Sequence, residues 1–60
     1  MLETDPGEII IEFVRNGPYV KCSAIHVATG REVSALGPAQ EPKAVERVAL
    51  AKLKRVLAQA

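Results

Sequence analysis

Three short segments of this chain are rich in apolar residues, the first of them in β-branched and aromatic ones, and a fourth segment repeats its apolar residues every three or four positions. These three segments are EIIIEFV (8–14), YVKCSAIHVA (19–28) and REVSAL (31–36), each bounded by glycine- or proline-containing turns. Short apolar runs of this kind between turn signals predict β-strands, and the three- and four-residue repeat of residues 42–59 predicts an amphipathic helix. The pattern therefore predicts an α+β domain, a three-stranded antiparallel meander with one C-terminal helix packed on one face (β-β-β-α).

The first turn, RNGP, sets the expected register of the first hairpin. With residues 15–18 as a four-residue loop, Val14 pairs with Tyr19 and Glu12 falls opposite Lys21, an attractive cross-strand pair. A two-residue loop at positions 16 and 17 has the same register but needs an N–H that Pro18 lacks, so we favour the longer loop.

The second turn contains Thr29 and Gly30. Continuing the meander through these two residues pairs His26 with Val33. A three-residue loop with Gly30 in a bulge would shift this register.

Both the predicted sheet and the predicted helix have an apolar side. The helix stripe consists of Val45, Val48, Ala49, Leu53, Val56 and Leu57. The apolar sheet face consists of Ile9, Ile11, Phe13, Val20, Cys22, Ala24, Val33 and Ala35. We expect the helix to cover this sheet face, because each apolar side needs a partner.

Sixty residues form one small domain, and such domains are marginally stable alone. We expect a flexible lead-in over 1–7 and a single domain over 8–60, stabilised by self-association or by another protein, because one cysteine permits no internal disulfide. The N-terminus does not resemble a signal peptide and the apolar runs are short, so we expect no membrane span and a cytoplasmic location.

Cys22 and His26 are the one cysteine and the one histidine of the chain, four positions apart. Four strand residues span ~13 Å, whereas a nucleophile and its base need contact at ~3 Å. They are also too few for a zinc site. The glycines match no phosphate-binding loop. We expect no catalytic residue, no metal, no cofactor, no evident small-molecule site and no enzymatic activity.

The other face of the predicted sheet is the first candidate for a binding surface. Its sizeable apolar residues are Ile10, Val14, Tyr19, Ile25, Val27 and Leu36. Apolar groups gathered on an otherwise wet face are typical of an interaction site. We therefore predict a protein-interaction module, most simply a homodimer, that uses this face or an exposed strand edge.

An alternative function is weak binding of nucleic acid, with RNA the first candidate. Net charge is only +1, but the last third of the chain is basic. The residues that would contact phosphates are Arg15 at the first hairpin and Lys43, Arg47 and Lys54 on the outer face of the helix.

The strings EIIIEF, VKCSAIHVATGREVS and LGP, followed by the helix, resemble a family of small uncharacterised alphaproteobacterial proteins of unknown function. This resemblance implies the fold and a bacterial cytosolic origin, and it implies no activity. A looser likeness is to the C-terminal part of the double-stranded RNA-binding domain, through Gly17-Pro18, the second turn and residues 44–53. The chain has Val20 where that family has a histidine, and Glu41-Pro42 where it has lysines, so this likeness implies topology rather than RNA contacts.

Overall fold

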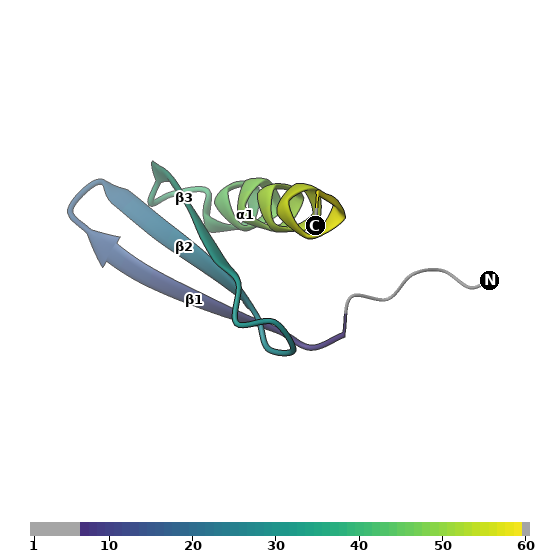
Figure 1. Cartoon of the computed structure of the whole chain (residues 1–60). Coiled ribbons are helices and arrows are strands. Elements are labelled where there is room, and N and C mark those ends of the chain that lie inside the picture. The colour runs from purple at the N-terminus through teal and green to yellow at the C-terminus, as the bar shows by residue number, and fades with distance from the viewer. Residues whose placement is uncertain (1–6, 60) are drawn as a thin grey trace.

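The computed structural model describes residues 7–59, and their architecture is the predicted β-β-β-α meander. Strands β1 (Ile9–Asn16), β2 (Tyr19–His26) and β3 (Glu32–Pro38) form one antiparallel sheet in the order β1-β2-β3. Helix α1 (Pro42–Ala58) lies against one face of this sheet (Figure 1). The predicted lead-in falls, except for its last residue, outside the described residues.

The predicted register of the first hairpin is wrong by two residues. Asn16 pairs with Tyr19, so the loop is Gly17-Pro18 alone, and Glu12 lies opposite Ser23 instead of Lys21. Gly17 has φ +64°, and a glycine at the first loop position suits a type II′ turn, whose twist matches that of the strands. In this loop Pro18 needs no N–H for the ladder, which removes the reason for a longer loop.

The second hairpin also differs from the expected register by two residues. Ala24 pairs with Val33, and His26 does not reach Val33. Instead the His26 N–H donates to the Arg31 carbonyl at 2.8 Å, and the Gly30 N–H donates back to the His26 carbonyl at 2.8 Å. Gly30 adopts φ +74°, which glycine reaches at no steric cost, so the loop is wider than predicted.

Both shifts are even, so every side chain keeps its predicted face of the sheet. The buried core joins the expected sheet residues to the helix and consists of Val20, Cys22, Ala24, Ala35, Val45, Ala49 and Leu53. The largest fully buried side chains are Leu53 and Cys22. The helix and the central strand therefore supply most of the core.

Helix α1 begins as the sequence indicates, with Pro42 in its first turn and Glu41 as an N-cap that makes no side-chain hydrogen bond. Its buried face is narrower than the predicted stripe. Val45, Ala49 and Leu53 are buried, whereas Val48 is 53% exposed, which corrects its placement in the core. A helix that rests on two strands buries a smaller arc than one that crosses a whole sheet.

The helix is seated on the β2–β3 half of the sheet, and β1 lies at the far side (Figure 1). Gly37 of β3 permits this position. A Cβ atom on Gly37 would lie 2.6 Å from Cγ2 of Val45, so the first turns of α1 approach β3 more closely than any larger residue allows.

Candidate interaction surface

Strand β1 turns three apolar side chains, Ile9, Ile11 and Phe13, toward the side of the sheet that carries α1. Ile9 and Ile11 are half-buried at the margin of the core, and Phe13 is 45% exposed although its strand partner Cys22 is fully buried. The difference arises because α1 packs against β2 and β3. Phe13 was predicted to lie in the covered face, and the structure corrects this expectation.

The helix supplies a wall beside these residues. Leu50 and Leu57 are partly buried, and helical geometry puts them on the side of α1 opposite Lys52. Lys52 reaches the outer edge of β3, so the leucine side faces β1. A shallow depression on this flank is lined by Lys43, Glu46, Arg47 and Leu50.

The backbone of β1 adds hydrogen-bonding groups to this apolar side. Within residues 7–59, β1 pairs with β2 alone, so it is an edge strand. The Val27 N–H donates to the Glu8 carbonyl at 3.2 Å, so these two residues form a hydrogen-bonded pair. Hydrogen-bonded and non-hydrogen-bonded pairs alternate along an antiparallel ladder, so every second residue of β1 directs its backbone groups away from β2. The N–H and C=O groups of Ile9, Ile11 and Phe13 consequently point away from β2. We call these three residues, side chains and outward backbone together, the β1 surface.

The opposite edge of the sheet is protected. Lys52 of α1 donates its Nζ to the Ser34 carbonyl of β3 at 2.8 Å, so a helix side chain occupies an edge acceptor. Pro38 ends the same strand without an N–H. Lysine and proline are common devices against unwanted pairing at a sheet edge. Of the two edges, β1 is therefore the one available to a further strand.

The six residues predicted as an interface lie on the face turned away from α1, which we call the open face. Five of them are exposed, from 45% for Ile10 to 69% for Leu36, and Ile25 is half-buried. Ile10 pairs with Ile25 at one end of the sheet, near Val27. Val14, Tyr19 and Leu36 lie toward the other end.

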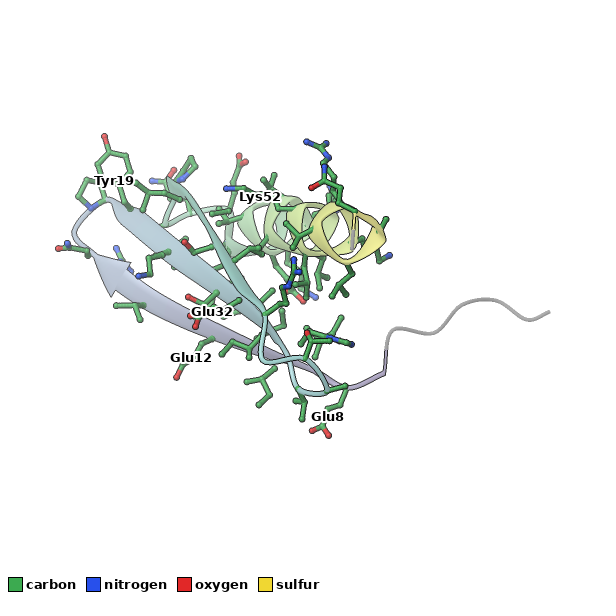
Figure 2. The ribbon with its side chains drawn as sticks, viewed as in Figure 1. Glu8, Glu12, Tyr19, Glu32 and Lys52 are labelled. Atoms are coloured by element: carbon green, nitrogen blue, oxygen red, sulfur yellow. The ribbon has the colours of Figure 1, made fainter. Side chains whose placement is uncertain are left out.

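A polar row separates these two apolar groups. Glu12, Ser23 and Ser34 are neighbours across the three strands, and Figure 2 shows Glu12 projecting from the sheet away from α1. Glu32 lies beside Ile25 in the next row. The structure thus brings the predicted residues onto one face, in two clusters separated by the row that contains Glu12 and not in one continuous patch.

The residues of the nucleic-acid alternative are all exposed. Lys43, Arg47 and Lys54 follow one another along the outer side of α1. Arg15 lies at the β1–β2 hairpin, where its Nε donates to the Gly17 carbonyl at 3.1 Å. The Ala39 N–H bonds to the Pro18 carbonyl at 2.9 Å, so this hairpin and the start of α1 share one end of the molecule.

Cys22 and His26 both face the helix, and each has a structural place. Cys22 is fully buried, and burial raises the pKa of its thiol, with the Glu46 carboxylate adding to the effect. A neutral thiol is a weak nucleophile. His26 is buried at the end of β2, and its Nδ1 shares a hydrogen bond of 2.8 Å with the Thr29 hydroxyl. This bond ties the second loop to the sheet.

Sequence reasoning offered an exposed strand edge as an alternative interface, but it missed the exposure of the side chains of the β1 surface. These side chains were assigned to the covered face because successive strand residues point to opposite faces of a sheet. This rule gives the face on which a side chain lies, but it does not say how much of that face the helix covers. The one available signal was that a single helix has to cover three strands. A helix is about 10 Å wide, which is close to the width of two strands spaced ~4.8 Å apart, so one strand is expected to remain partly uncovered.

Neither a metal-binding group nor a membrane helix stands out in the described part of the chain. No three or more His, Cys, Asp and Glu side chains there are grouped to hold a metal ion. No helix among residues 7–59 has the length and apolar character needed to cross a membrane.

Comparison with known proteins identifies a family and no relative of known activity. No curated protein and no solved structure matches the chain. A family model described as a domain of unknown function (DUF6898) matches residues 6–60, which is nearly the whole chain and all three strands and the helix. The chain therefore belongs to the DUF6898 family.

Proposed function

We propose that this domain is a non-enzymatic protein-interaction module and that it binds its partner through the β1 surface. The observation that carries the proposal is the position of α1 over β2 and β3, which leaves an apolar edge strand beside it uncovered. Exposed, apolar edge strands are sites of association, because they offer both apolar area and unpaired backbone groups. The bacterial origin and cytoplasmic location expected from the sequence belong to this proposal.

Phe13 gives the scale of the interaction. An aromatic side chain buries about 150–250 Å² when it is covered, and Phe13 still has 45% of its surface exposed. Covering that remainder contributes about 2 kcal/mol at 25 cal/mol per Å². Ile9 and Ile11 add smaller areas. For a domain of this size such a gain is a large fraction of the total stability.

The open face is a less favourable primary surface. Its two apolar clusters are divided by the row that contains Glu12, and a partner covering both would have to desolvate that carboxylate. The β1 surface has no acidic side chain among its three residues. We therefore assign the open-face residues a secondary role, as rim contacts of a partner that wraps around β1.

The proposal is tested by placing a photo-cross-linking residue, p-benzoylphenylalanine, at position 13 and irradiating cells that make the protein. We expect covalent protein adducts at position 13. Val48 is exposed to a similar degree, 53% against 45%, and lies on α1, so the same residue at position 48 is the matched control and should give none. Absence of adducts at position 13, or adducts at position 36 of the open face in its place, would contradict the proposal.

A second candidate function is weak binding of nucleic acid by the outer side of α1. It is supported by the exposure of Lys43, Arg47 and Lys54 along one side of the helix. Neutralising three phosphates would give a slope of about −2 to −3 for the logarithm of affinity against the logarithm of salt concentration. Replacing the three by glutamine should abolish binding, and an unchanged affinity would eliminate this function.

A further inference from the structure

We infer that the partner of the β1 surface is a second copy of this chain, joined β1 to β1 in antiparallel orientation about a two-fold axis that passes Ile11. The inference rests on the proposed function and names its partner. It follows from three features of the structure: the hydrogen-bonding chemistry of the edge, the protection of the other edge, and the order of side chains along β1.

The outward N–H and C=O groups of Ile9, Ile11 and Phe13 are matched by another strand, because an extended backbone has the same spacing of donors and acceptors. A second β1 presents the same groups with the same spacing. One two-fold contact therefore satisfies the edges of both copies, which is the self-complementary arrangement typical of homodimers. A β3 strand is a poor partner, since Lys52 occupies its Ser34 carbonyl.

The protected β3 edges also determine the size of the assembly. In the joined sheet the order is β3-β2-β1-β1-β2-β3, so the two outer edges are both β3 strands with Lys52 in place. Pairing stops there, and the dimer is closed instead of growing into a filament. A two-fold axis perpendicular to the sheet keeps both α1 helices on the same side.

The order of side chains along β1 selects the register. With Ile11 on the axis, each Phe13 lies opposite Ile9 of the other copy, and each Glu12 lies opposite Ile10. With Glu12 on the axis, two carboxylates would face one another directly, which is destabilising. Ile11 on the axis therefore joins apolar side chains on the helix side and separates the like charges.

The basic sides of the two helices do not oppose this arrangement. Each α1 sits over a β2–β3 pair, so the two helix axes are four strand spacings apart, or ~19 Å. This distance exceeds the Debye length of ~8 Å at physiological ionic strength. Lys43 and Arg47 line the flanks that face one another, so their charges are closer together than the axes, but both side chains are exposed to solvent, where salt screens their repulsion.

Cysteine cross-linking tests the partner and the register together. In the register with Ile11 on the axis, residues 11 of the two copies form a hydrogen-bonded pair with Cα atoms ~5.5 Å apart, within the range of a disulfide. Ile11→Cys should oxidise to a covalent dimer. The wild type, whose Cys22 is buried, is the control and should stay monomeric on a non-reducing gel.

A second pair of variants tests the same register if Ile11→Cys does not fold. Ile9→Cys and Phe13→Cys should not cross-link separately, because each is ~13 Å from its own copy, but an equimolar mixture should give a mixed disulfide. Cross-linking of Phe13→Cys alone, or of Ile11→Cys mainly with Phe13→Cys, would overturn the register.

The remaining outcomes separate this inference from the proposed function. If no cysteine variant cross-links while the photo-adduct at position 13 is heavier than twice the chain mass, self-association is wrong and the interaction module stands. If neither experiment gives an adduct, both are wrong.

Discussion

Replacing Gly37 by alanine tests why α1 lies where it does. The added Cβ atom would be 2.6 Å from Cγ2 of Val45, well inside van der Waals contact, and Val45 is only 4% exposed, with little room to move. A valine in a helix strongly prefers one χ1 rotamer, so it cannot easily rotate away. The helix must shift or the core must accept strain.

The magnitude follows from two opposing terms. Overpacking a core by one methyl group costs about 1–3 kcal/mol. Gly37 does not have a positive φ, so alanine can adopt its backbone conformation. Alanine also restricts the unfolded chain, which stabilises the folded state by about 0.4–1 kcal/mol. We expect a net loss of about 1 kcal/mol in the free energy of unfolding. In a domain of this size that lowers Tm by about 4–8 °C.

The assay is a double-mutant cycle followed by thermal and urea unfolding. In a Val45→Ala background the clashing methyl groups are gone, so Gly37→Ala should become neutral or stabilising by up to about 1 kcal/mol. The coupling energy between the two positions is then about 1–3 kcal/mol. An equal loss from Gly37→Ala in both backgrounds, or no loss in the wild type, would refute the argument that Gly37 sets the position of the helix.

Two further predictions concern the buried thiol and the protected edge. The pKa of Cys22 is raised by burial, so the free energy of unfolding should be full at neutral pH and should fall as pH rises above about 8.5, the ordinary thiol value. Urea unfolding of the wild type and of Cys22→Ala across pH tests this, and the loss should be absent from Cys22→Ala. Lys52→Ala removes the donor to the Ser34 carbonyl, which should lower the free energy of unfolding by no more than about 1 kcal/mol but expose the β3 edge. Species larger than a dimer should then appear in sedimentation. Lys52→Arg should retain a donor and stay dimeric.

The sequence was sufficient for the element types, their order and the face of each side chain. Alternation in a strand fixes the face, and the hairpin registers were each wrong by two residues, which leaves every face unchanged. The registers themselves depended on loop conformation. Gly17 and Gly30 adopt positive φ in loops whose lengths the turn residues alone did not determine.

The position of the helix across the sheet could not be predicted from periodicity. Val48 and Phe13 both fit the apolar patterns of their elements, yet both are about half exposed, because the helix rests on two strands. Gly37 and Val45 lie close together through the turn that joins β3 to α1, and we expect their contact to set this placement.

The most direct test of the account is the mass of the protein in solution, measured by light scattering over a hundredfold range of concentration. We expect twice the chain mass of 6.4 kDa at the upper end, with a Tm that rises with concentration because association stabilises the folded state. Phe13→Lys should reduce the mass to that of one chain, whereas Leu36→Lys on the open face should leave the dimer intact. A wild-type mass of 6.4 kDa at every concentration, with a constant Tm, would contradict self-association through β1.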